Sequence, residues 1–187
     1  MSIVERARRI CLSPDTEWPV IAGESATLAT LLPGYVLPLA GVSAVALLIG
    51  SVLSGLSIMS ALSLAITGLV GALVGVALVS FIIDGLAPAF GAEKNSDRAS
   101  KVAAYSGTAG WVAGVAQIIP GVGGLISMLG GLYSLYLLYL GLLRVMKSPP
   151  NKAVAYAIAV VVVAVVVFAV VFYLAGMLGL NVGMTPA

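Results

Sequence analysis

Long apolar segments without a single charged residue are the feature that most restricts how this chain can fold. Five of them follow residue 33, at about 34–53, 57–83, 102–119, 124–143 and 153–178. Each is close to, or longer than, the about 20 residues that a helix needs to cross a hydrocarbon core of ~30 Å. Only 9% of the 187 residues are charged, whereas a water-soluble domain carries about 25%. The sequence therefore predicts an all-α integral membrane protein with five transmembrane helices.

The last of these segments contains a run rich in valine, from Ala159 to Val171, which in water would favour a buried strand. In lipid, an unpaired strand leaves its backbone N–H and C=O groups without hydrogen-bond partners, whereas a helix satisfies them internally. The pattern of alternating residues that a β-barrel requires is also missing. We therefore expect a helix here as well.

The nine Lys and Arg residues predict the orientation. Three lie in residues 1–33, three in the loop 84–101 and three in the loop 144–152, while the other two connections and the tail have none. Because Lys and Arg concentrate in cytoplasmic loops, all three clusters are expected inside, with the N-terminus in the cytoplasm and the C-terminus outside. The sequence thus predicts a multi-pass protein of the cytoplasmic membrane, with a cytoplasmic N-terminal region (1–33) and a five-helix domain (34–187).

Residues 1–33 have the pattern of amphipathic helices. Apolar residues recur at helical spacing (Ile3, Ala7, Ile10, Cys11), with Glu5, Arg6, Arg8 and Arg9 expected on the other faces. Ser13 and Pro14 are typical of a helix start. One apolar stripe is predicted to follow along this second helix: Trp18, Ile21, Ala22, Ser25, Leu28, Ala29 and Leu32. Such a stripe suits the headgroup region or packs on the protein's own membrane helices, and both interpretations stay open.

The composition argues against catalysis and against ion-coupled transport. The chain has no His, so Ser-His and Cys-His pairs and histidine metal sites are excluded, and we expect no enzyme activity, metal or cofactor. None of the five segments carries an ionisable acid or base at its centre, although coupled transporters usually keep one there. A passive pore stays open.

Polar and small residues inside the segments permit two further interpretations. A polar groove between the third and fourth segments would be lined by Trp111, Gln117, Tyr133, Tyr136 and Tyr139. Alternatively, these tyrosines supply hydroxyl groups for bonds between helices or lie near an interface. Gly71 and Gly75 match the spacing of a close-packing motif, which favours tight packing within the bundle over dimerisation and leaves a homo-oligomer open.

Several short stretches together resemble short prokaryotic members of the Yip (Ypt-interacting protein) family. They run in family order along nearly the whole chain: Glu5-Arg6-Ala7-Arg8-Arg9-Ile10-Cys11-Leu12-Ser13-Pro14, Leu86-Ala87-Pro88-Ala89-Phe90-Gly91, Ala104-Tyr105-Ser106-Gly107-Thr108, Ile119-Pro120-Gly121-Val122-Gly123-Gly124 and Leu132-Tyr133-Ser134-Leu135-Tyr136. The resemblance implies five transmembrane helices with a cytoplasmic N-terminus. Eukaryotic members bind Rab-type GTPases, and their Asp-Leu-Tyr-Gly-Pro motif is matched here only at Asp84 and Pro88.

From these observations we expect a non-enzymatic, membrane-organising adaptor that works through its cytoplasmic face. The alternative is a small-solute channel, a transporter or a lipid-handling protein that uses the polar groove. The expected partners are membrane lipids and a cytoplasmic protein, not nucleic acid. The expected interaction surface consists of Arg6, Arg9, Trp18, Asp84, Pro88 and Lys101. Within it, Asp84 either pairs with Arg6, Arg9 or Lys101, or merely marks where the second helix leaves the lipid.

Overall fold

The computed structural model describes residues 1–177, and this part of the chain contains helices and turns but no strand. In chain order the elements are α1 (Ile3–Leu12), α2 (Pro14–Gly23), α3 (Leu28–Leu31), η1 (Leu32–Val36), α4 (Leu37–Leu53), α5 (Ile58–Leu86), η2 (Ala87–Phe90), α6 (Ser96–Ser106), α7 (Thr108–Gly114), η3 (Val115–Ile118), α8 (Gly123–Arg144) and α9 (Pro150–Met177). The all-helical prediction is confirmed. Leu178, the predicted last residue of the fifth segment, and the tail after it lie outside the described residues.

Four helices are long and apolar enough to cross a membrane within the described part: Leu28–Leu53, Ile58–Phe90, Gly123–Arg144 and Pro150–Val171. The predicted third segment, 102–119, differs from these. It forms α6, α7 and η3, and the α-helix is interrupted at Gly107, where the Trp111 ring packs so closely that a Cβ would lie 2.9 Å from it. Residues 1–177 therefore contain four continuous candidate spans and one broken segment beside them.

The first span begins earlier than residue 34, because a new helix begins after Thr27 and continues directly into the span. The backbone N–H of Thr27 donates to the hydroxyl of Thr30, and α3, η1 and α4 then run without a break. The helix that begins at Pro14 ends at Gly23, and residues 24–27 are not helical. The prediction of one continuous apolar stripe from Trp18 to Leu32 was therefore wrong: its members lie on α2, on the non-helical residue Ser25 and on the helix that begins at Leu28.

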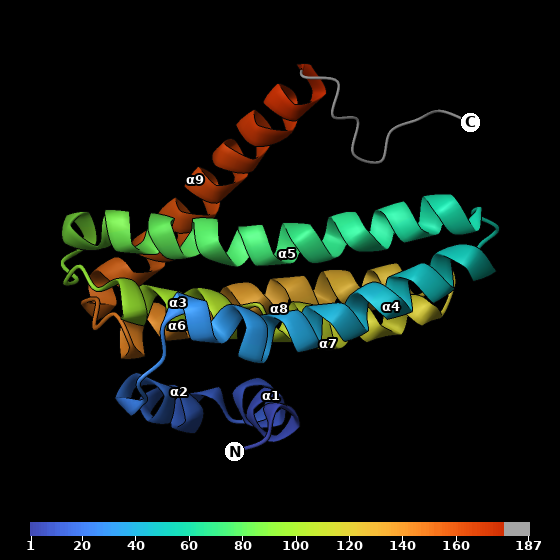
Figure 1. The fold of residues 1–187 in the computed structure, drawn as a ribbon. Helices are drawn as coiled ribbons and strands as arrows, with labels where there is room; N and C mark the ends of the chain where they lie inside the picture. The colour runs from blue at the N-terminus through green and yellow to red at the C-terminus, as the bar shows by residue number, and fades with distance from the viewer. Residues whose placement is uncertain (178–187) are drawn as a thin grey trace.

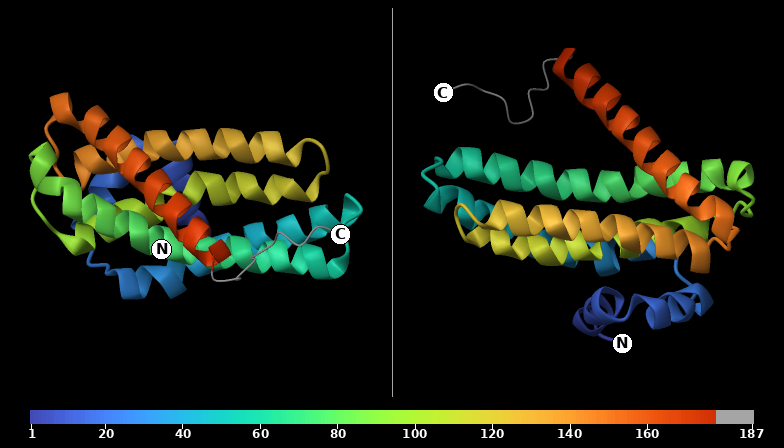
Figure 2. Two further views of the ribbon diagram at one scale, coloured as in Figure 1. Left: turned by 90° about the horizontal axis from the view of Figure 1, so that it is seen from above. Right: turned by 180° about the vertical axis from the view of Figure 1, so that it is seen from behind.

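The helices α4, α5, α7 and α8 lie side by side along one axis (Figure 1). One end of this bundle carries the turns after α4 and η3, and we call it the turn end. The other carries the loop between η2 and α6 and the connection from α8 to α9, with their acidic and basic residues, and we call it the charged end. The views in Figure 2 show α1 and α2 on one flank of the bundle, while α9 crosses the opposite flank at a steep angle.

Glycines determine how closely the helices approach, but not the two that the sequence suggested. A Cβ at Gly130 of α8 would lie 2.2 Å from Ala113 Cβ, and one at Gly50 of α4 would lie 1.8 Å from the carbonyl oxygen of Gln117. By contrast, a Cβ at Gly71 would meet nothing within 4 Å, and one at Gly75 would meet only the Phe168 side chain, at 3.3 Å. Close packing within the bundle thus occurs at other glycines.

Gly130 and its neighbour Gly131 provide a matched test of this packing. Gly130→Ala is expected to destabilise the protein by about 1–3 kcal/mol, because α7 and α8 must separate to make room for the methyl group. A Cβ at Gly131 meets nothing within 4 Å, so Gly131→Ala should be neutral or slightly stabilising, as expected from helix propensity alone. Thermal unfolding in mild detergent, followed by circular dichroism, measures both. Equal midpoints for the two variants would contradict the close approach.

Candidate functional site

A buried ion network connects α1 to α2 and to the segment that follows it. The guanidinium of Arg6 donates to the carboxylates of Glu17 and Glu24 and lies 5.7 Å from the centre of the Tyr105 ring in α6. Arg6 is 7% exposed and Glu17 is 3% exposed. Burial lowers the pKa of Arg6, but the hydrogen bond and charge of Glu24, with the charge of Glu17, outweigh it and raise that pKa. Arg6 therefore stays charged and bound to these acids.

Lys101 joins the same region to α6. Its ammonium donates to the carbonyl oxygens of Ala22, at 3.1 Å, and Glu24, at 2.9 Å, which lie at the C-terminal end of α2. Burial, and then the nearby positive charge of Arg98, lower the pKa of Lys101. The negative charges of Glu24 and Asp97 raise it, but by less, so the pKa is lowered. A cation at the end of a helix satisfies carbonyl groups that have no partner within the helix. Lys101 thus anchors the C-terminal end of α2 to α6.

Trp18 packs on the protein's own helices, and this was one of the two interpretations that the sequence left open. Its side chain is fully buried, as is that of Ile21. A Cβ at Gly141 of α8 would lie 2.9 Å from the Trp18 ring and 2.9 Å from a methyl group of Val102 in α6. The glycine therefore creates the space that the indole occupies.

Asp84 is not paired with the cations that were considered for it. Arg6 binds Glu17 and Glu24, Lys101 binds backbone carbonyls, and Arg9 binds Glu5 at 2.6 Å. Oδ1 of Asp84 is buried and has no hydrogen-bond partner among the residues that the structure describes. Pro88, the other residue matched to the family motif, is exposed in η2.

Two adjoining polar depressions lie at the charged end. The first, of about 320 Å³, is lined by Glu24, Ser25, Ala26, Thr27, Thr30, Asn95, Asp97, Arg98 and Lys101. The second, of about 240 Å³, is lined by Thr27, Leu28, Ala29, Ser80, Phe81, Asp84, Ser96, Asp97 and Ser100. They share Thr27 and Asp97, and we call the two together the polar double pocket. Its side chains offer carboxylates, hydroxyls and basic groups to a partner, and Asp84 lies in its second half.

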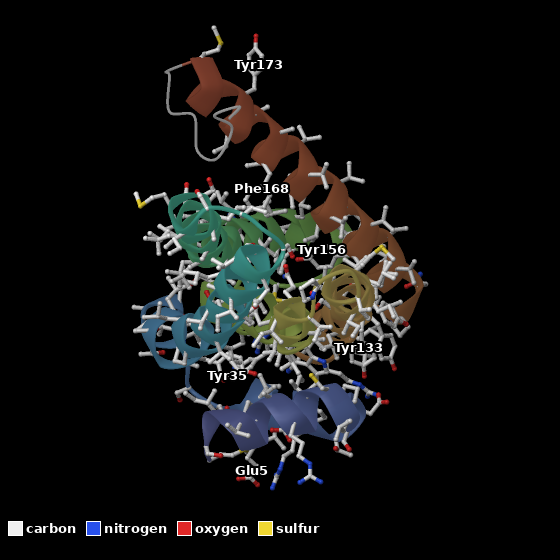
Figure 3. All side chains as sticks on the ribbon, turned by 90° about the vertical axis from the view of Figure 1, so that its right-hand side faces the viewer. Glu5, Tyr35, Tyr133, Tyr156, Phe168 and Tyr173 are labelled. Atoms are coloured by element: carbon white, nitrogen blue, oxygen red, sulfur yellow. The ribbon has the colours of Figure 1, made fainter. Side chains whose placement is uncertain are left out.

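The five residues of the predicted intramembrane groove are not brought together. Trp111 lines an apolar cleft beneath α9, whereas Gln117 lies at the turn end beside Gly50. The Tyr133 hydroxyl donates to the carbonyl oxygen of Cys11 at 2.9 Å, and the ring centres of Tyr133 and Tyr136 are 5.6 Å apart. Tyr139 is half-buried and packs against the core. Figure 3 shows Tyr133 on the side of the bundle that faces α1.

Sequence reasoning missed Glu17, Glu24 and Tyr105, and it placed Arg6 on the wrong face of α1. Ile3, Arg6, Ala7 and Ile10 follow the spacing i, i+3, i+4 and i+7, so Arg6 belongs to the buried side of the helix. This spacing was the available indication. An arginine on an apolar stripe requires an acid opposite it, and Glu17 occupies a buried position of α2 in the same way.

Comparison with known protein families gives a match. The model of the Yip1 domain family matches residues 8–171, a range that starts within α1 and ends within α9. The match thus includes the second half of α1 and all of α2 as well as the bundle. No curated protein and no solved structure matches the chain.

Proposed function

The chain belongs to the Yip1 domain family, and from this premise we propose that this multi-pass membrane protein is a non-enzymatic adaptor that organises the membrane through its charged end. The observation that carries the proposal is the polar double pocket, where a buried carboxylate oxygen of Asp84 lacks a partner in the described chain. The Asp84 carboxylate lines the second depression and has an acceptor left unpaired, so a donor from a bound protein that enters this depression would be stabilising. A lysine, an arginine or a backbone N–H of the partner suits this position.

The proposal includes a topology in which α6, α7 and η3 form the third of five crossings. These elements run beside α4 and α8. At the interruption, the Thr108 hydroxyl donates to the carbonyl oxygen of Tyr105 and also forms a hydrogen bond of 2.9 Å with the Tyr35 hydroxyl. Irregular backbone is tolerated at membrane depth when it is buried in protein. The clustering of Lys and Arg supports a cytoplasmic charged end in the cytoplasmic membrane of a cell.

Single cysteines test the topology in a Cys11→Ala background. Ser54→Cys and Ile119→Cys at the turn end should react with a membrane-impermeant maleimide added to intact cells, because both positions are exposed. Glu93→Cys and Asn151→Cys at the charged end should react only after the membrane is permeabilised. Asn95 is unsuitable, because its side chain caps α6. Reaction of Glu93→Cys in intact cells would refute the orientation.

Charge reversal tests the binding role of the double pocket. Asp84→Lys should reduce capture of protein partners from a membrane extract at least tenfold, since it replaces the free acceptor by a cation beside Ser80 and Ser100. Asp15→Lys is the matched control, because Asp15 is exposed on α2 and pairs with Arg144 at 3.4 Å, away from the pocket. Thermal stability is measured for both variants. If Asp84→Lys leaves capture and stability unchanged, Asp84 is only a boundary residue and the proposal fails.

A solute pathway between the third and fourth segments has less support. The helices α7 and α8 approach so closely at Gly130 that no side chain fits between them there. The Ser134 hydroxyl accepts from the N–H of Gly110 and donates to the carbonyl of Gly130, so it already has partners within the protein. The larger cleft beneath α9, of about 380 Å³, is lined almost wholly by apolar side chains.

A further inference from the structure

The apolar surface of the bundle differs in height between its two flanks. On α5, exposed apolar residues extend from Ile58 to Phe81, which at the helical rise of ~1.5 Å per residue is about 35 Å. On α8 they extend only from Leu125 to Tyr136, or about 17 Å. Beyond Tyr136 most of α8 is buried beneath α2, α6 and α9. One flank thus matches a hydrocarbon core of ~30 Å, and the other covers about half of it.

The helix α1 lies where the short apolar surface ends. Its last turn is fixed to the middle of α8 by the hydrogen bond between the Tyr133 hydroxyl and the Cys11 carbonyl, ten residues from the start of α8. Its outer face carries Glu5, Arg8 and Arg9, all exposed, and Glu5 points away from the bundle (Figure 3). Charged side chains at the centre of a bilayer are strongly unfavourable. Because the buried Arg6 network fixes this position of α1, the surrounding lipid must adapt instead.

We infer that the bilayer is thinned on the α1–α2 flank, where phospholipid headgroups of the proposed cytoplasmic leaflet descend to the level of α1. A membrane responds to a short apolar surface by local thinning. The opposite flank, on α5, keeps the full thickness, so the protein bends the leaflet asymmetrically. This inference rests on the proposed membrane-organising function and gives that function a physical means.

The outer face of α1 has the chemistry of a headgroup-binding surface. Glu5, Arg8, Arg9, Leu12 and Ser13 line an open depression of about 290 Å³. Guanidinium groups bind phosphate oxygens through paired N–H donors. The exposed side chain of Leu12, 71% accessible, is placed to contact the upper parts of the acyl chains. The ligand that fits is therefore an anionic phospholipid of the surrounding bilayer.

Spin labels test the thinning in the full-length chain, reconstituted in vesicles of phosphatidylcholine and phosphatidylglycerol. In a Cys11→Ala background, one label replaces Val4 of α1 and the other replaces Val74 of α5. Val74 is exposed. Its neighbour Gly75 and the neighbour of Tyr133, Ser134, line the same cleft, so Val74 and Tyr133 lie at a similar depth along the bundle axis. The Val4 label should be several-fold more accessible to a nickel chelate than the Val74 label, which should respond mainly to oxygen. Equal, oxygen-dominated responses would overturn the inference.

Lipid retention tests the binding surface. Native mass spectrometry of the detergent-purified protein should show several-fold less bound phosphatidylglycerol for Arg8→Gln/Arg9→Gln than for the wild type. The matched control is Lys94→Gln/Lys152→Gln, which removes two exposed positive charges at the charged end, away from α1. Unchanged retention in the arginine variant, or an equal loss in the control, would refute a specific surface on α1.

The outcomes separate this inference from the proposed function. A reversed maleimide pattern, or partner capture that does not depend on Asp84, would overturn the adaptor proposal and leave the contrast between Val4 and Val74 in place. Loss of that contrast, with capture intact, would overturn the thinning alone.

Discussion

Arg6→Ala is expected to destabilise the protein by about 3–5 kcal/mol, because it leaves the buried carboxylate of Glu17, and the partly exposed one of Glu24, without their cation. The contact between α1–α2 and the bundle should fail first. Intrinsic fluorescence then reports the loss, since Trp18 moves from a dry pocket into a more polar environment. Thermal unfolding in mild detergent gives the magnitude.

Arg9→Ala is the control for this variant. Arg9 also binds a carboxylate, that of Glu5 at 2.6 Å, but both side chains are about half exposed. Exposed pairs at this helical spacing contribute about 0.3–0.5 kcal/mol. Arg6→Met combined with Glu17→Gln and Glu24→Gln should recover part of the lost stability, because no unpaired charge remains. If Arg6→Ala and Arg9→Ala proved equally mild, the ion network would not hold the flanking helices.

Trp18→Asp should have a similar or larger effect. Removing a buried aromatic side chain costs about 3–5 kcal/mol, and the new carboxylate would face Val102 and Gly141 without a cation beside it. Trp18→Phe should be milder, because the indole N–H has no hydrogen-bond partner to lose within residues 1–177. Limited proteolysis between α2 and α3 measures the release of the N-terminal helices.

Val20→Asp distinguishes burial from a general effect of charge on α2. Val20 is 46% exposed on the same helix, so a carboxylate there stays solvated. This variant should keep the stability and the protease resistance of the wild type. Equal cleavage of the Trp18→Asp and Val20→Asp variants would show that the contact with Gly141 does not hold α2.

The sequence was sufficient for the features that depend on local chemistry. Apolar length predicted the helices α4, α5, α8 and α9 to within several residues, and Pro14 does begin a helix. Which residues far apart in the sequence contact each other could not be predicted in the same way. Which glycine meets which neighbour depends on the rotation of each helix about its axis, so Gly130 is packed tightly and Gly71 faces open space.

The candidate site shows the same limit. Charge counting places Arg6, Arg9 and Lys101 in one region with Asp84, but the choice of partner depends on geometry. Lys101 donates to a carbonyl oxygen at the C-terminal end of α2, and this end exists only because the chain stops being helical after Gly23. The break at Gly107 was equally hidden, because glycine within an apolar segment is common in membrane helices and does not by itself interrupt one.

The position of α9 has a consequence for the order of assembly. Among the residues whose burial is described, the buried ones of α9 are Ala153, Tyr156 and Val160, all within its first three turns. There the Tyr156 hydroxyl donates to the carbonyl of Ile83, and the Tyr156 ring stacks on the Phe90 ring, with the ring centres 4.9 Å apart. The helix has 28 residues in all, and we expect the part beyond Val160 to face mainly lipid. Such a helix can insert on its own and dock last, pivoting on Tyr156, once the other helices have packed.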